Sequence, residues 1–220
     1  MKNIFKSSIG RKIAMALSGI FLIVFLTQHF LINITSVFSE DIFNMLSHFM
    51  GNNPLVQFVL QPVLIAGVLF HFVMGFILEW QNRKARPVTY AMYKGSKNSM
   101  FVSRNMIISG IVILSFLVLH FYDFWVPEMD YKYIQSLPED PNRYYEELIH
   151  KFENPVRVAL YCLSFIFLAL HLVHGLSSSA QSLGTNNKYA TTIEKISFAF
   201  GIAIPLGFCF IALYHFFIHF

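Results

Sequence analysis

The sequence predicts an all-α integral membrane protein, a bundle of five transmembrane helices, and three observations support this fold class. First, 55% of its 220 residues are hydrophobic and only 13% are charged, which is about half the charged fraction of a soluble domain. Second, five stretches reach the roughly 20 apolar residues that a helix needs to cross the hydrocarbon layer. Third, basic residues gather in alternate connections between these stretches. We therefore expect a single transmembrane domain over residues 1–220, embedded in the lipid bilayer.

The expected spans cover the ranges 13–35, 56–80, 105–126, 156–180 and 193–219. We interpret the first as a retained helix, because its apolar part exceeds a signal-peptide core of roughly 7–15 residues and no small-x-small cleavage site follows it. Cytoplasmic flanks of membrane helices are enriched in Lys and Arg. Of the 16 basic residues, 12 lie in the N-terminal tail and in the second and fourth connections. The sequence therefore predicts a cytoplasmic N-terminus, an outer C-terminus and a place in the cell (inner) membrane.

The connections, the cysteines and the net charge carry weaker signals. The third connection, 127–155, is acidic and contains four prolines, so we expect either a cap with a short helix over Tyr144–Lys151 or a solvated loop. Cys162 and Cys209 lie in apolar runs and are predicted to be small buried hydrophobic residues. The net charge of +4 is small, and the charges are distributed by side of the membrane. This argues against nucleic-acid binding, because that function needs a concentrated basic face.

An internal repeat places four histidines in the first four spans. A Ser-Gly-Ile motif begins 11 residues before His29 in the first span and 11 residues before His120 in the third. A glycine follows His71 by four residues in the second span and follows His171 by four residues in the fourth. The order of the first two spans is thus echoed by the next two, as though a two-helix unit occurs twice.

Depth in the membrane sorts these histidines into two pairs. At 1.5 Å per residue, His29 and His120 lie roughly 24–26 Å from the cytoplasmic flanks of their helices, whereas His71 and His171 lie about 16–18 Å from theirs. We therefore expect an outer pair (His29 and His120) and an inner pair (His71 and His171). A polar side chain in the apolar layer is costly and marks a functional site, unless it forms an interhelical hydrogen bond. That simpler interpretation stays open for any single histidine.

Two layers of paired imidazoles favour haem as the ligand. Bare zinc takes three or four protein ligands, whereas haem iron needs only two axial ones. The sequence lacks a C-x-x-C-H motif, so two non-covalent, b-type haems are predicted. Small residues flank the histidines on the same helix faces, although small residues at helix contacts are also ordinary membrane packing. These flanking residues are Gly67 and Gly75, Gly175, and the motif serines Ser18 and Ser109.

The other histidines are weaker candidates. His174 competes with His171, but its counterpart in the second span is Met74, so the repeat argues against it. The remaining ones are predicted to be interfacial, in the case of His215 and His219, or solvated, in the case of His48 and His150.

Essentially the whole chain resembles the cytochrome b membrane-anchor subunits of succinate:quinone oxidoreductases, in the five-helix, two-haem class of succinate dehydrogenases and fumarate reductases. The segments that carry the resemblance are Gln28-His29-Phe30, Phe70-His71-Phe72, Leu119-His120-Phe121 and 170–175. It implies that His29 and His120 bind the outer haem iron and His71 and His171 the inner one, which is also the pairing obtained from depth. It further implies a flavoprotein subunit, an iron–sulfur subunit on the cytoplasmic face, and quinone, usually menaquinone, near the outer haem.

No Gly-rich dinucleotide fingerprint and no cysteine cluster occur in the sequence, so flavin and iron–sulfur chemistry fall to those other subunits. The reduction of quinone to quinol takes two electrons and two protons. We therefore expect a carboxylate or amide near the outer haem that handles these protons. Asp123, one turn after His120, is the first candidate and Glu40 the next. The further candidates are Asp41, Gln57 and Gln61 for quinone, and Arg11, Lys12, Arg83 and Lys188 for haem propionates.

The basic segment 83–104 is a candidate docking surface for the partner subunits, although positive-inside topology and lipid contact alone explain its charge. Two other functions stay open. One is a cytochrome b subunit of another quinone-linked dehydrogenase or reductase. The other is a proton-linked transporter with intramembrane histidines as relays. A transporter predicts Gly or Pro breaks in paired spans, and only the fifth span has a mid-helix proline, Pro205.

Overall fold

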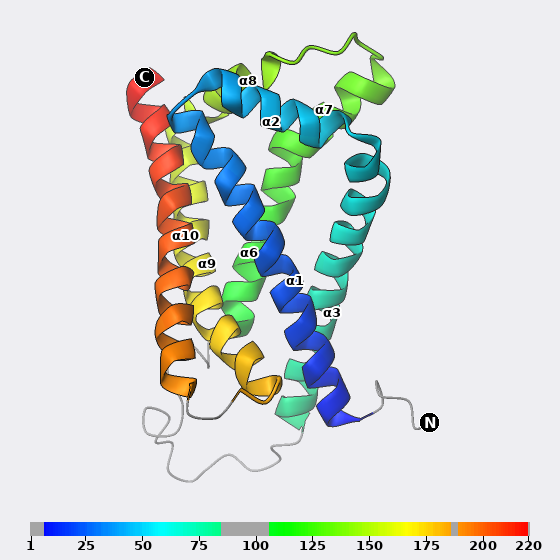
Figure 1. The fold of residues 1–220 in the computed structure, drawn as a ribbon, viewed down its shortest axis with the longest axis vertical. Helices are drawn as coiled ribbons and strands as arrows, with labels where there is room; N and C mark the ends of the chain where they lie inside the picture. Colours follow the sequence, from blue (N-terminus) through cyan, green and yellow to red (C-terminus); the bar gives the residue numbers. More distant parts are fainter. Residues whose placement is uncertain (1–6, 85–105, 186–188, 220) are drawn as a thin grey trace.

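The computed structural model describes residues 7–84, 106–185 and 189–219. These residues are helical apart from short turns, and five helical segments are long and apolar enough to cross a membrane: Ser8–Val37, Val56–Lys84, Met106–Ile134, Pro155–Ser182 and Ala190–His219. The segments stand side by side, with the first helix starting at one end of the bundle and the last one finishing at the other (Figure 1). The predicted all-α architecture with five spans is confirmed, and the protein is a multi-pass membrane protein.

The first span begins with a capped helix and is followed by one that the sequence analysis missed. Helix α1 (Ser8–Ile34) starts where the Ser7 hydroxyl accepts a hydrogen bond from the Gly10 amide at 2.9 Å, and it ends in the short 3₁₀ turn η2 (Thr35–Val37). Helix α2 (Glu40–Asn52) then lies across one end of the bundle (Figure 1). Its first turn carries Glu40 and Asp41, and negative charge there is favoured by the helix dipole.

Two spans contain π-helical turns that prolines explain. Helix α3 (Gln61–Lys84) follows the π turn η3 (Val56–Leu60), and helix α6 (Met106–His120) runs into the π turn η4 (Phe121–Trp125). Each π turn ends two residues before a proline, Pro62 or Pro127. A proline has no amide proton and its ring clashes with the carbonyl four residues earlier, so a wider turn lets the helix continue.

The third span is longer than predicted. After η4 the helix continues through α7 (Val126–Met129) and a further π turn, η5 (Asp130–Ile134), so it does not end near residue 126. The remaining helices are α8 (Arg143–Phe152), α9 (Pro155–Ser182) and α10 (Ala190–His219). The short helix expected near Tyr144–Lys151 is therefore confirmed as α8.

Helices α2 and α8 form a cap over one end of the bundle, which we call the cap end (Figure 1). Leu148 and Phe152 of α8 are buried against Val158 and Tyr161 of α9. This part of the connection therefore packs on the bundle as a cap, whereas residues 135–142 before it are exposed. Arg143, the first residue of α8, is buried and bonds Glu128 of α7 and Glu147 of α8. Burial alone lowers the pKa of Arg143, but these two hydrogen bonds raise it above its ordinary value. The cap is thus fastened by a charged arginine.

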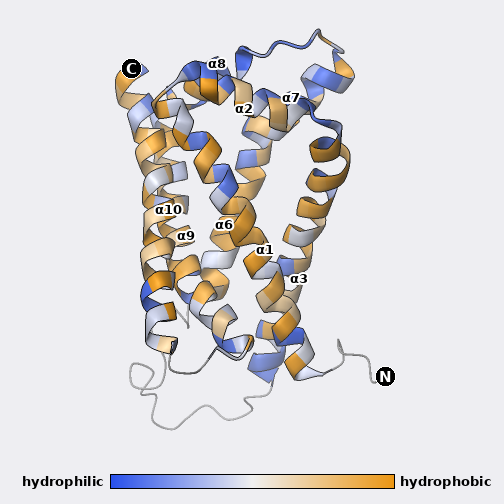
Figure 2. Cartoon of the chain, viewed as in Figure 1, coloured by the Kyte–Doolittle hydropathy of each residue, from blue (hydrophilic) through white to orange (hydrophobic). Residues whose placement is uncertain are grey.

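The opposite end, which we call the basic end, carries basic residues at the helix ends, and hydrophilic colour gathers there in Figure 2. The described ones are Arg11, Lys12, Arg83, Lys84 and Lys195. Most of the segment 83–104 and the residue Lys188 lie outside the described residues, so the predicted docking surface is not described. The hydropathy pattern otherwise shows apolar helix surfaces between two polar ends (Figure 2).

The bundle is packed unevenly. Its main core joins α9 and α10 with the cap, and consists of Phe43, Leu148, Phe152, Val158, Tyr161, Phe165, Ile204, Phe208, Ile211 and Ala212. Of the 24 residues of α3, by contrast, only Met74 is buried. Cys162 and Cys209 are free thiols that meet where α9 packs on α10, and both are partly buried. Helix α3 therefore packs less closely in the bundle than α9 and α10 do.

Candidate functional site: two histidine pairs

The structure brings the four predicted histidines together in two pairs. The ring centroids of His29 on α1 and His120 on α6 lie 5.7 Å apart. Those of His71 on α3 and His171 on α9 lie 6.3 Å apart. All four side chains are half-buried. The two pairs are those expected from depth and from the repeat, although the pairing alone does not assign a ligand.

Each ring of the inner pair lies within hydrogen-bond distance of a motif serine. The Ser18 hydroxyl donates to the Met15 carbonyl at 2.8 Å and also lies 2.9 Å from His71 Nδ1. When the single hydroxyl proton of Ser18 bonds the Met15 carbonyl, the second contact is a hydrogen bond from Nδ1–H of His71 to Ser18 Oγ. Nε2 of His71 is then left unprotonated, with a lone pair available to a metal.

The second half of the repeat has the same arrangement. The Ser109 hydroxyl donates to the Met106 carbonyl at 2.9 Å and lies 3.1 Å from His171 Nδ1. With this hydroxyl proton on the carbonyl, Nδ1–H of His171 donates to Ser109 and Nε2 is left unprotonated. A hydrogen bond from the non-ligating nitrogen is the usual way in which proteins orient a metal-binding histidine. The motif serines, predicted only as small residues that flank the histidines, thus contact both imidazoles of the inner pair.

The structure extends the repeat beyond the residues that the sequence analysis singled out. A Cβ atom on Gly19 would lie 3.5 Å from His71 Cε1, and one on Gly110 would lie 3.9 Å from His171 Cε1. Equivalent methionines also face the equivalent glycines: a Cβ on Gly75 would lie 3.6 Å from Met15 Cε, and one on Gly175 would lie 3.4 Å from Met106 Cε. The shared Met-x-x-Ser-Gly-Ile pattern was a signal for these methionines that the sequence analysis missed.

The outer pair lies among aromatic rings and has an unpartnered nitrogen. His29 stacks on Phe25 and His120 on Phe116, with centroid distances of 5.5 and 5.7 Å. The Asn33 amide donates to the His29 carbonyl at 2.8 Å and lies 3.4 Å from its Nδ1. Nδ1 of His120 is buried without a hydrogen-bond partner among the described residues. A buried, unsatisfied imidazole nitrogen is costly, which favours a functional group over simple packing.

The geometry of both pairs fits a metal held between opposed imidazoles. A metal–nitrogen distance of about 2 Å on each side places two coordinated rings with their centroids roughly 6 Å apart, close to the two observed separations. Each pair supplies two nitrogens. This falls short of the three or four ligands of bare zinc but equals the two axial ligands of haem iron. The residues present therefore fit haem.

A polar cavity of about 560 Å³ opens at the basic end between α1, α3 and α9. Its polar lining consists of Lys12, Asn82, Ser178, Ser179, Gln181 and Ser182. A Cβ on Gly19 would contact both Ser179 Oγ, at 3.4 Å, and His71, so the cavity lies beside the inner pair. Of the predicted propionate partners, Lys12 thus lines a suitable site. Arg83 is instead bonded to Glu79 at 2.6 Å on the surface.

Asp123 is buried in a polar network rather than exposed at the membrane edge. Its side chain is fully buried, and its two carboxylate oxygens accept hydrogen bonds from Arg157 at 2.6 Å and from Tyr161 at 2.8 Å. Arg157 itself is partly exposed, and the Tyr161 ring contacts His120. Glu40 is exposed on α2. The proton-handling role of Asp123 and Glu40 stays a prediction, but Asp123 has no direct opening to lipid.

Two of the remaining histidines differ from expectation. His215 is 1% exposed rather than interfacial, because Nε2 bonds Ser36 at 2.9 Å and the ring stacks on His219. His48, predicted to be solvated, is half-buried and bonds Asn52 at 2.8 Å. His150 is exposed, as expected, and His174 belongs to neither pair.

On the prediction that the inner pair binds haem, replacing Ser18 or Ser109 with alanine is expected to weaken that binding about 10- to 100-fold, because the hydrogen bond that orients the ligating imidazole is lost. Haem transfer to an excess of a scavenging protein, followed by absorbance, measures this. Ser115→Ala is the matched control, since the Ser115 hydroxyl bonds only the Ile111 carbonyl on the exposed side of α6. Equal haem loss from the control and the two test variants would contradict the assignment.

Comparison of the chain with known protein families, with curated proteins and with solved structures finds no match. The functional argument therefore rests on the two histidine pairs and their surroundings.

Proposed function

We propose that this chain is the dihaem cytochrome b anchor subunit of a succinate dehydrogenase or fumarate reductase, which passes electrons between a cytoplasmic iron–sulfur subunit and membrane quinone. The observation that carries the proposal is that four histidines on four different helices form two pairs of neighbouring imidazoles. Both rings of the inner pair also contact the equivalent serines of the repeat through Nδ1, which leaves Nε2 to bind a metal. Both inner rings form interhelical hydrogen bonds, to Ser18 on α1 and to Ser109 on α6, but these bonds use Nδ1 and leave Nε2 of each ring to bind a ligand.

His29 with His120 and His71 with His171 would hold the two haem irons, which when bound supply one-electron carriers at two depths in the membrane. Other residues of the chain would hold the four imidazoles in place. Ser18 and Ser109 fix the inner rings, and Phe25 and Phe116 pack flat against the outer ones. Propionate carboxylates need donors and a cation. The polar cavity at the basic end offers Lys12 together with hydroxyl and amide groups.

In this proposal the basic end faces the cytoplasm, in keeping with the positive-inside rule. A flavoprotein subunit and an iron–sulfur subunit dock there, because this chain lacks the motifs for flavin and iron–sulfur clusters. Quinone, with menaquinone as the expected type, reacts on the side of the outer pair and takes two electrons and two protons to become quinol. Asp123 is the first proposed proton-handling residue, since Arg157 links its buried carboxylate to the surface, and Glu40 is the second.

The absorption spectrum of the purified protein tests this function against the transporter interpretation. We expect the reduced protein to show the bands of b-type haem, and we expect a succinate-oxidising flavoprotein to co-purify from mild detergent. Folded protein without haem bands would contradict the proposal and favour a proton relay. Haem bands with a flavoprotein or molybdoenzyme of another specificity would instead indicate the anchor of a different quinone-linked enzyme.

A further inference from the structure

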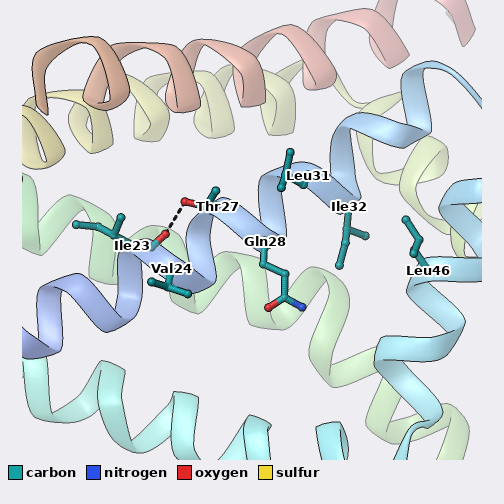
Figure 3. A pocket seen from close by; sticks show the side chains of 7 residues that line it. All are labelled: Ile23, Val24, Thr27, Gln28, Leu31, Ile32 and Leu46. Atoms are coloured by element: carbon teal, nitrogen blue, oxygen red, sulfur yellow. Dashed lines mark hydrogen bonds between the residues drawn. The ribbon is translucent and has the colours of Figure 1, made fainter. Parts of the chain in front are cut away.

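A second cavity, of about 460 Å³, lies against α1 beneath the cap and faces outward from the bundle. It is lined by Ile23, Val24, Thr27, Gln28, Leu31, Ile32 and Leu46. Figure 3 shows Gln28 and Val24 on one side of α1, with Leu46 facing the helix from α2. Val24 and Leu31 are 64% and 59% exposed, so in a bilayer this groove opens to lipid. Its volume lies within the roughly 300–1,000 Å³ of small-molecule sites.

The amide of Gln28 is the one polar group of this groove that is not already well bonded. The Thr27 hydroxyl donates to the Ile23 carbonyl at 2.8 Å, as the dashed line in Figure 3 shows. Gln28 is exposed on the half of α1 nearer the cap, and its described contact is a 3.4 Å approach of Nε2 to the Met50 thioether of α2, which is a weak acceptor. An amide in hydrocarbon without good partners is costly, and acyl chains offer none.

The occupant that this chemistry fits is an apolar ring system with an oxygen that accepts or donates a hydrogen bond. The amide N–H can donate to a quinone carbonyl, and the amide oxygen can accept from a quinol hydroxyl, so Gln28 serves both redox forms. The aliphatic lining suits the ring and the first part of an apolar tail, and a groove open to lipid admits a molecule that diffuses in the bilayer. Gln28 also directly precedes His29 of the outer pair.

We propose that this groove between α1 and α2 binds the quinone head group and that Gln28 is its polar anchor. This site rests on the proposed function, and it differs from the positions that the sequence favoured. Asp123 is enclosed by Arg157 and Tyr161, Glu40 lies at the exposed start of α2, and the Gln57 amide already donates to the Tyr133 hydroxyl at 2.5 Å.

The test uses the complete complex in lipid nanodiscs with a photoreactive azidoquinone. We expect label in the peptides that contain Gln28 and Leu46, displaced by excess unlabelled quinone and not by excess phospholipid. Gln28→Leu is expected to raise the KM for quinol about 5-fold, the loss of one hydrogen bond, and Leu46→Trp to raise it more than tenfold by filling the groove. Leu206→Trp, equally lipid-facing on α10, controls for the added bulk and leaves the KM unchanged.

Haem content separates the possible failures. If both haems are present and the label lies elsewhere, or if Gln57→Leu raises the KM while Gln28→Leu does not, the groove is not the quinone site and the dihaem function stands. Label displaced by phospholipid but not by quinone shows a lipid site and also overturns the inference. If the complex contains no haem, the proposed function fails and the inference fails with it.

Discussion

Replacing His171 with alanine is expected to remove the inner haem and leave the outer one, so that the haem content of the chain falls by half. His171 and His71 face each other at 6.3 Å, and Ser109 holds the His171 ring with Nε2 unprotonated. Loss of one of only two axial nitrogens leaves the metal without its protein support on that side. The haem content of purified protein, measured by absorbance per mole of chain, checks this result.

His174→Ala is the matched control, because it removes an imidazole one turn away on the same helix. We expect this variant to retain both haems, since His174 belongs to neither pair. If His174→Ala loses a haem and His171→Ala does not, the repeat-based assignment is wrong. If His174→Ala retains both haems but slows quinol turnover, His174 acts through the environment of the inner pair rather than as a ligand.

Replacing Arg157 with glutamine is expected to destabilise the protein by about 3–5 kcal/mol, because it leaves the charge of a buried ion pair without its partner. The Asp123 side chain is fully buried, whereas Arg157 is partly exposed. The variant therefore leaves the Asp123 carboxylate as a buried charge without a counter-ion. Thermal unfolding in detergent, followed by circular dichroism, measures the change. The double variant Asp123→Asn/Arg157→Gln removes both charges and should recover most of the lost stability. Equal loss in the single and double variants would contradict the ion pair.

Asp123→Asn alone separates the stabilising role of this carboxylate from its proposed proton role. It retains the size and hydrogen-bonding capacity of the side chain but cannot ionise. With both haems present, we expect quinone-linked turnover to fall while succinate oxidation with a dye acceptor continues. Unchanged turnover and an unchanged pH profile would rule Asp123 out as the proton-handling group and make Glu40 the next residue to test.

The five spans and the two histidine pairs were predictable because both depend on local patterns in the sequence. Apolar runs identify the spans, and the shared interval between the Ser-Gly-Ile motif and His29 or His120 places equivalent residues at equivalent depths. The end of the third span was not predictable from Pro127, because a π turn lets the helix continue through a residue that normally interrupts it. Helix α2 was missed because it is short and lies across the bundle instead of spanning it.

The buried contacts of His215 and Asp123 depend on distant residues, and no local pattern reveals them. His215 bonds Ser36, which is 179 positions away in the chain, and Asp123 bonds Arg157, which is 34 positions away. Both histidine and aspartate at a span end are ordinarily interfacial or solvated, so local chemistry alone gave the opposite expectation. The Ser18–His71 and Ser109–His171 bonds were predictable in part. The repeat identified the two serines as equivalent residues, but it did not show which side chains they contact.

The number of haems per chain tests the central claim most directly. A pyridine haemochrome assay on the purified complex, referred to the mass of this chain, is expected to give two b-type haems, one for each histidine pair. A value of one would show that one of the two pairs is only a structural contact between helices. A value of zero in folded protein would contradict the haem assignment of all four histidines.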